Sequence, residues 1–329
     1  MKSDVVISVK NLKKAFRKRE RKHGLAEAFK QLFSTRFEIK QALRGISFDV
    51  KKGEILGFIG PNGAGKSTAI KAMCGILYPD SGRVKVLKYD PWEEREDYVR
   101  NIGVVFGQKS QLWWDLPAVD SFYLMRDLYN IPEKAFKKRL DFLVDLLDVK
   151  EYLGVQVRTL SLGERMRCEL IVALLHNPKI VFLDEPTIGV DVIAKAKIRN
   201  FIRELNKKEG TTFIVTTHDM SDIEQLCERI VVITNGEILY DGLLSKIKDE
   251  FYNSKFIHVK FRTKVPKIKL PKGCELVKGT DYEKEIEINL KKQKVANVVD
   301  FLIKNYKVLD LAVSDPDIDE IIKDIYEKK

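Results

Sequence analysis

The sequence has no long apolar run. No stretch approaches the roughly 18 uninterrupted apolar residues of a membrane-spanning helix. The N-terminus, Met1-Lys2-Ser3-Asp4, lacks the apolar segment of a signal peptide. These two absences argue against a chain that crosses a membrane or enters the secretory route by itself. We therefore expect a cytoplasmic protein.

Cysteine is also scarce. The four cysteines, Cys74, Cys168, Cys227 and Cys274, are widely spaced and form no Cys-x-x-Cys pair. Their spacing argues against a structural metal site and against a disulfide framework. Such usage is typical of a protein that works in a reducing cytosol.

The charge balance is basic, with 59 Lys and Arg against 48 Asp and Glu. A basic excess can indicate nucleic acid or an anionic membrane surface as a partner. Because both signs are mixed along most of the chain, we interpret the charges as a solvated surface and expect no nucleic-acid partner. The length of 329 residues and the apolar share of 44% predict two domains with sizeable cores.

The most informative segment that is present is a glycine-rich one. Its residues are Gly60, Pro61, Asn62, Gly63, Ala64, Gly65, Lys66, Ser67 and Thr68. It follows an apolar run at 55–59 and opens a helix-compatible run at 69–73, which is the strand–turn–helix context of a phosphate-binding loop. Backbone N–H groups of such a loop, and the helix N-terminus behind it, attract phosphate oxygens. Lys66 can reach the β/γ phosphates and Ser67 can offer a hydroxyl to Mg²⁺.

Two acids close a later apolar strand, 180–183. Asp184 at the strand end can hold Mg²⁺, directly or through water. Glu185, the next residue, can act as a general base on an attacking water. The alternative is that both are surface acids that simply end a strand, and the phosphate-binding loop upstream argues against it.

Polar residues end two further strand patterns. His218 follows the buried run 212–216, where a histidine can hydrogen-bond a γ-phosphate and hold the water in line. Gln108 follows the apolar run 102–106 and can contact Mg²⁺ and the water. A lone histidine or glutamine is more often structural, so both assignments depend on the neighbouring motifs.

The segment around Ser161, Gly163 and Glu164 precedes a helical pattern. Ser161 and Glu164 have the spacing of a helix capping box. Alternatively, the Ser161 hydroxyl and the Gly163 backbone could meet a γ-phosphate at this helix N-terminus. The two interpretations are compatible with each other.

The coarse pattern predicts an α/β fold with a mainly parallel sheet. Two buried strands flank a long helix at 193–206, which is a βαβ unit. A basic segment at 17–40 looks like an inserted surface helix between two strands. After residue 242 the pattern changes to three short strands, a helix, a strand and a last helix at 316–327. We therefore expect an ATP-binding domain at 1–242 and a small C-terminal α+β domain at 243–329.

The motifs follow one another in the order loop 60–68, Gln108, the segment 161–164, Asp184-Glu185, Asp191 and His218. In this order the chain resembles the nucleotide-binding subunit of ABC transporters over roughly residues 3–242. The resemblance implies an ATPase with an antiparallel β subdomain and a helical subdomain at about 109–175. It also implies Mg²⁺ and a dimer, with a second copy or a paralogous ATPase subunit, that sandwiches two ATP molecules.

In that family the phosphate-binding loop of one subunit faces the signature segment of the other. The resemblance thus implies that Ser161, Gly163 and Glu164 act in trans, and that Asp191 belongs to the loop that bridges the two sites. This chain departs from the usual Leu-Ser-Gly-Gly-Gln, because Leu162 replaces a glycine and Glu164 an amide.

Two further features of the family leave alternatives open here. The aromatic residue that stacks on adenine is Phe16, which follows the first strand, or Phe37, which has the familiar spacing before Ala42. We favour Phe16. Trp113 and Trp114 either pack inside a subdomain or line a surface groove for a short helix of a permease.

The segment 102–117, the basic insertion and the signature variant make the chain similar to ABC-2-type export ATPases, including viologen-exporter-like ones. The resemblance implies an integral membrane permease as partner and a peripheral position at the cytoplasmic face of the membrane. The alternative is a soluble single-cassette ABC ATPase in a non-transport assembly complex.

Overall fold

The computed structural model describes residues 4–19, 37–107, 109–251, 254–315 and 321–322. These residues belong to two compact units, Met1–Gly242 and Leu243–Lys329, and each is described by itself. Among the described residues, no helix combines the length and the apolar character needed to span a bilayer.

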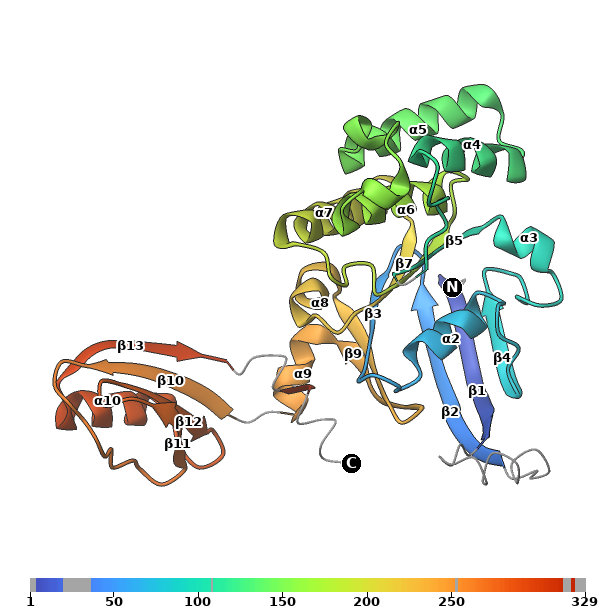
Figure 1. Ribbon diagram of the computed structural model, residues 1–329. Coiled ribbons are helices and arrows are strands. Elements are labelled where there is room, and N and C mark those ends of the chain that lie inside the picture. Colours follow the sequence, from blue (N-terminus) through green and yellow to red (C-terminus); the bar gives the residue numbers. More distant parts are fainter. Residues whose placement is uncertain (1–3, 20–36, 108, 252–253, 316–320, 323–329) are drawn as a thin grey trace, which may run out of the picture. The chain divides into compact units, whose positions relative to one another are not determined.

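A six-stranded sheet forms the centre of the first unit (Figure 1). Its strands, in spatial order, are β5 (Ile102–Phe106), β6 (Ile180–Asp184), β7 (Thr212–Thr216), β3 (Ile55–Ile59), β8 (Arg229–Thr234) and β9 (Glu237–Leu243). The neighbours from β5 to β8 pair in parallel. Every residue of β6 and β7 is buried, as continuous apolar runs covered on both faces require.

Helices surround this sheet. They are α2 (Lys66–Met73), α3 (Arg95–Val99), α4 (Ala118–Leu128), α5 (Glu133–Leu147), α6 (Leu162–Leu174), α7 (Val192–Glu209) and α8 (Met220–Leu226). Helix α6 packs against β5 and against α4, α5 and α7. It therefore joins the central sheet to α4 and α5, the other helices of the helical part at 109–175, which Figure 1 shows in green.

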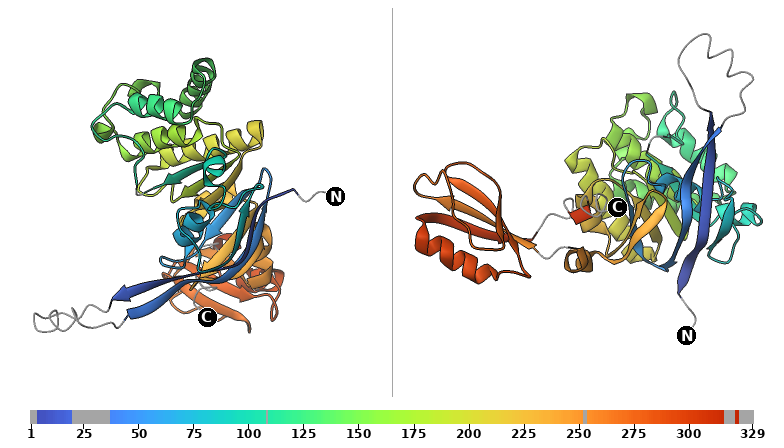
Figure 2. Two further views of the ribbon diagram at one scale, coloured as in Figure 1. Left: turned by 90° about the vertical axis from the view of Figure 1, so that its right-hand side faces the viewer. Right: turned by 90° about the horizontal axis from the view of Figure 1, so that it is seen from below.

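An antiparallel sheet of three strands completes this unit: β1 (Val5–Arg19), β2 (Phe37–Lys51) and β4 (Ser81–Val86). β1 and β2 each span 15 residues, and Figure 2 shows their outer parts as a projecting ribbon. The prediction that the basic segment at 17–40 leaves the sheet is wrong for its described ends. Cross-strand pairing satisfies their backbone groups from Phe16 opposite Lys40 to Arg19 opposite Phe37. The helix predicted near residues 26–33 lies outside the described residues.

The second unit begins with α9 (Leu244–Phe251) and contains an antiparallel sheet of order β11-β12-β10-β13. The strands are β10 (Ser254–Phe261), β11 (Cys274–Gly279), β12 (Glu283–Asn289) and β13 (Val308–Ser314), and α10 spans Val295–Asn305. Inward residues of β10 and β12 pack with Val298 and Leu302 of α10 in one apolar core. The last helix expected at 316–327 lies largely outside the described residues.

A buried ionic network ties α7 to α8 beneath the sheet edge. Arg199 on α7 contacts Asp222 on α8 at 2.5 Å, and the Thr187 hydroxyl donates to the same carboxylate at 2.5 Å. Arg199 is 8% exposed and Asp222 1%. Because the charges are desolvated, each depends on its partner.

We predict that Asp222→Ala lowers the free energy of unfolding of the first unit by about 3–5 kcal/mol, because it leaves a buried guanidinium unpaired. Urea unfolding followed by tryptophan fluorescence measures this loss. All three tryptophans of the chain lie in the first unit, so the signal reports on it.

The matched control is Glu204→Ala, which removes the partner of Lys208 from an exposed i,i+4 pair on α7. This variant should lose less than about 1 kcal/mol. Similar small losses in both variants would contradict a structural role for the buried network.

Candidate nucleotide site

Parallel pairing brings three strand ends to the same edge of the central sheet. Asp184 of β6 pairs with Thr216 of β7, and Thr216 pairs with Phe58 of β3. The glycine-rich loop begins at Gly60, directly after β3. The loop, the acids that follow β6 and the histidine that follows β7 are therefore neighbours, as the sequence predicts for a parallel sheet.

At two glycines of the loop, the Cβ of any other residue would clash with a backbone carbonyl. A Cβ at Gly60 would lie 2.1 Å from the carbonyl oxygen of Ile233. Gly65 has φ of 114° and caps α2, and a Cβ there would lie 2.6 Å from the carbonyl oxygen of Ala42. The loop thus turns tightly against β2 and β8, which directs the N-terminus of α2 toward the cavity.

Lys66, the first residue of α2, is largely buried at 7% exposure. Its ammonium donates to the carbonyl oxygens of Gly60 at 2.6 Å and Pro61 at 3.3 Å. Burial lowers the pKa of this amine, while Glu185 and Asp184 act in the opposite direction. The cation is held within the curve of the loop, where a phosphate would replace the carbonyl oxygens as its partner.

Asp184 is buried at the end of β6 and accepts two hydrogen bonds through Oδ1. The donors are the hydroxyls of Ser67 at 3.1 Å and Thr216 at 2.7 Å. A carboxylate beside a serine hydroxyl is a hard-oxygen donor set that fits Mg²⁺ with phosphate oxygens and water completing it. Ser67 and Asp184 are thus brought together as predicted, whereas Gln108 lies outside the described residues.

Thr216 is a part of the site that the sequence analysis did not identify. Its hydroxyl donates to Asp184 and accepts from the backbone N–H of Glu185 at 3.1 Å. The Glu185 N–H also lies 3.0 Å from the Thr216 carbonyl oxygen. A single buried side chain therefore fixes both acids. Its signal in the sequence, a threonine at the end of a buried strand, is too common to stand out.

Glu185 adopts a left-handed conformation with φ of 57°, which is unfavourable for a residue that has a Cβ. Its carboxylate contacts His218 Nδ1 at 2.7 Å. The carboxylate is 16% exposed and the imidazole 60%. The left-handed backbone and the contact with His218 together fix the position of the Glu185 carboxylate.

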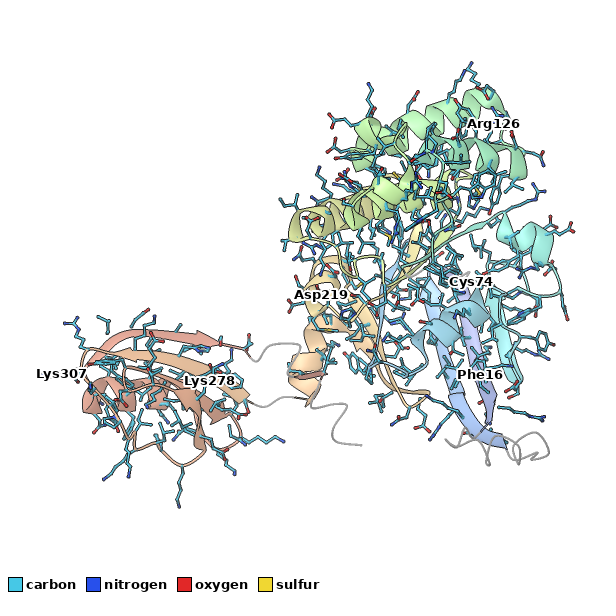
Figure 3. The ribbon with its side chains drawn as sticks, in the orientation of Figure 1. Phe16, Cys74, Arg126, Asp219, Lys278 and Lys307 are labelled. Atoms are coloured by element: carbon cyan, nitrogen blue, oxygen red, sulfur yellow. The ribbon has the colours of Figure 1, made fainter. Side chains whose placement is uncertain are left out.

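The phosphate-binding loop, Glu185 and His218 line one cavity of about 560 Å³. It is lined by the loop residues 61–68 and by Phe16, Lys40, Ala42, Glu185, Ile188 and His218. Phe16, labelled in Figure 3, lies on β1 and is 42% exposed. Phe37 is paired at the outer end of the ribbon, and its side chain lies outside the described part. Phe16 is thus among the residues that line the cavity.

The signature segment forms the N-terminus of α6. Ser161 is the N-cap: its hydroxyl accepts from the Glu164 N–H at 3.3 Å, and its own N–H donates to the Glu164 carboxylate at 2.8 Å. Burial acts to raise the pKa of that carboxyl, but hydrogen bonds from Ser161 and Tyr152 outweigh it and hold the pKa low. The capping box that the sequence predicts is thus present, and it uses the acid that replaces the usual amide.

Gly163 lies against the loop that precedes α7. A Cβ at Gly163 would come within 2.7 Å of the Ala194 Cβ. Asp191 caps α7 by accepting from Ile193 N and Ala194 N, both at 2.9 Å. Leu162, the other departure from the usual signature, contacts the same loop, since a Cβ at Gly189 would lie 2.9 Å from it.

Ser161, Gly163, Glu164 and Asp191 are absent from the lining of the cavity around Lys66, although the structure describes all four. The sequence-predicted residues therefore form two groups. One surrounds the phosphate-binding loop, and the other lies at the adjoining ends of α6 and α7.

The sequence and the fold are similar to those of known proteins. The family model described as "ABC transporter" matches residues 43–188. An uncharacterized ABC transporter ATP-binding protein of Methanocaldococcus jannaschii is 32% identical over 84% of this chain and 94% of its own length. The ABC transporter ATP-binding protein NatA of Bacillus subtilis is 30% identical over 65% of this chain and 87% of its own length. Two further relatives are longer, and the chain spans 63% and 14% of them.

Among solved structures, the dimeric post-hydrolysis state of an ATP-binding cassette with ADP and Pi is similar, with a TM-score of 0.60 and 26% identity. That match covers 72% of this chain and 98% of the cassette. The chain belongs to the ABC transporter family. It is an ATP-binding subunit of the ATP-hydrolysing cassette type.

We predict that Gly163→Ala destabilises the first unit by about 1–3 kcal/mol, because the new methyl group must push α6 away from the start of α7. Alanine has the higher helix propensity, so without this clash the substitution would stabilise. The control is Gly154→Ala, where a Cβ would meet no atom within 4 Å. Urea unfolding of both variants measures the difference, and a stabilised Gly163→Ala protein would contradict the close approach.

Proposed function

We propose that the chain is the ATPase subunit of an ABC exporter and works as one half of a nucleotide-sandwich dimer. The observation that carries this proposal is one cavity lined by Lys66, Ser67, Glu185 and His218, with Asp184 hydrogen-bonded to Ser67 behind its wall. Phosphate binding, metal binding and water activation each need some of these residues.

The chemical step is an in-line attack of water on the γ-phosphorus, which forms a bond to the water oxygen, breaks the bond to the β–γ bridging oxygen and releases ADP and phosphate. The Glu185 carboxylate orients the water and accepts its proton, and His218 holds that carboxylate through the contact at 2.7 Å. Lys66 and the N–H groups of the loop stabilise the negative charge of the transferring phosphoryl group. Ser67 and Asp184, with Gln108, would hold Mg²⁺, which would supply positive charge to stabilise the phosphate groups.

Phe16 stacks on the adenine base. It lines the same cavity as the phosphate-binding loop, and the ammonium of Lys14 lies 5.9 Å from its ring centroid. Lys40, the cross-strand neighbour of Phe16, lines the same cavity. The aromatic face and the nearby cations suit a base joined to a polyphosphate.

The second half of each site comes from another subunit, either a second copy or a paralogous chain. Ser161 and Gly163 lie outside the cavity of their own chain, so they are free to meet the γ-phosphate of a partner. Glu164 supports them through the capping box, and Asp191 lies in the loop between the two sites. Directly after it, Val192 is 78% exposed and Ile193 73%, and a dimer would cover this apolar pair.

An integral membrane permease is the proposed partner at the helical part of the subunit. Trp113 and Trp114 are each about half exposed, and Leu116 and Tyr123 are nearly as accessible. The two tryptophans are therefore not buried inside the subdomain. Exposed large aromatics are suited to anchor a helix of a partner. Binding to a permease would place the subunit at the cytoplasmic face of the membrane.

Glu185→Gln should lower ATP hydrolysis by at least about 100-fold, because an amide cannot accept the proton of the water. ATP binding should remain, since Lys66 and the loop are unchanged. A phosphate-release assay and equilibrium ATP binding measure the two properties. Glu204→Gln, at an exposed position of α7, is the control. Full hydrolysis by Glu185→Gln would show that the catalytic assignment is wrong.

The transport assignment has its own test. The affinity-tagged chain, expressed in its native cells and extracted in mild detergent, should co-purify with a polytopic membrane protein. Trp114→Ala should weaken this association, whereas Tyr78→Ala, which removes another exposed aromatic, should not. Recovery of only soluble partners would favour the alternative, a non-transport ABC ATPase in an assembly complex.

A further inference from the structure

Helix α6 carries a buried acid that the catalytic site does not use. Glu169 is 3% exposed. It accepts from the backbone N–H of Gln111 at 3.0 Å, and the hydroxyl of Ser110 also donates to it. The backbone N–H of Leu112 in turn donates to the Ser110 hydroxyl at 3.2 Å. One carboxylate therefore receives two donors from a single loop, which follows β5.

This arrangement is costly unless the donors stay in place. Burial raises the pKa of the Glu169 carboxyl, while the hydrogen bonds from Ser110 and Gln111 act to lower it. A buried carboxylate that loses its donors pays the full cost of desolvation. These hydrogen bonds hold the loop and α6 in a fixed relative position, because a shift of either element would break them together.

A second contact joins the same helix to the same loop. Arg165, one turn before Glu169, places its guanidinium 4.9 Å from the centroid of the Trp114 ring. Arg165 and Glu169 are four residues apart on α6 and so lie on the same face of the helix. The face of α6 that carries both residues lies against the loop that leads into Trp113 and Trp114.

The other end of this connection is the N-terminus of α6. Ser161 and Gly163 lie there, about one turn before Arg165, and Gly163 packs tightly on the start of α7. Because an α-helix is stiff over a few turns, a displacement of the loop at 110–114 displaces Ser161 and Gly163 as well. Figure 1 shows α6 between β5 and the helical part.

We propose that Glu169 and Arg165 clamp the Trp113–Trp114 surface to the signature segment, so that both move as one body. Glu169 is a positioning residue: it touches neither nucleotide nor partner. The clamp makes docking of a partner on the tryptophans and engagement of a γ-phosphate by Ser161 mutually dependent, since each shifts the same helix. This inference rests on the proposed function, because it assumes that Ser161 meets ATP.

The test is hydrogen exchange by mass spectrometry of the full chain, in a Glu185→Gln background that keeps ATP bound. Adding ATP and Mg²⁺ should slow exchange at residues 161–166, where the nucleotide is engaged. It should also slow exchange at 113–117, which have no proposed contact with ATP. With Glu169→Ala added, 161–166 should still respond and the response at 113–117 should be lost.

Ser110→Ala is the milder companion variant, because it removes one donor at an exposed position and leaves the buried acid in place. It should reduce the response at 113–117, whether or not Glu169→Ala folds. Glu204→Ala, an exposed acid on α7, should leave both responses as in the parent.

A response at 113–117 that persists in both clamp variants would overturn the inference. So would a parent protein in which 161–166 respond and 113–117 do not. If neither segment responds and equilibrium dialysis detects no ATP binding, the proposed function itself fails, and that result is distinct from failure of the clamp.

Discussion

The in-register parallel pairing of β6, β7 and β3 is the constraint on which the rest of the site depends. Asp184 and Thr216 are paired across β6 and β7, and Thr216 is paired with Phe58 one residue before the end of β3. The Thr216 hydroxyl links this strand register to both acids of the site. It donates to Asp184 and accepts from the Glu185 N–H, so the two acids have fixed positions relative to the phosphate-binding loop. A slip by one residue would turn the carboxylates to the other face of the sheet.

Much of the candidate site could be predicted from the sequence, because its motifs are local patterns of residues. The loop around Lys66 carries its own strand, turn and helix pattern, and the acids at 184–185 directly follow an apolar run. The capping box of Ser161 and Glu164 is a spacing of three residues. Each of these motifs occupies a few consecutive positions, and parallel strands place their ends at the same edge whatever the loops do.

The rest depends on contacts between residues far apart in the chain. Thr216 is decisive only because it lies opposite Asp184, and Gly163 is required because Ala194 approaches it. Nothing near Glu169 in the sequence indicates that Ser110 will donate to it. The outer ribbon of β1 and β2 was missed for a related reason, since basic residues with scattered apolar ones satisfy a surface helix as well as a solvated strand pair.

Helix α6 joins these local and long-range features, since its first turn carries the signature residues and its buried face holds the loop with the tryptophans. The central claim is that this first turn completes the nucleotide site of another subunit. A crystal structure of the Glu185→Gln variant with ATP and Mg²⁺ tests it most directly. The account predicts Ser161 Oγ and the Gly163 N–H of one subunit within about 3 Å of the γ-phosphate held by Lys66 of its partner. A γ-phosphate enclosed by residues of a single chain would contradict it.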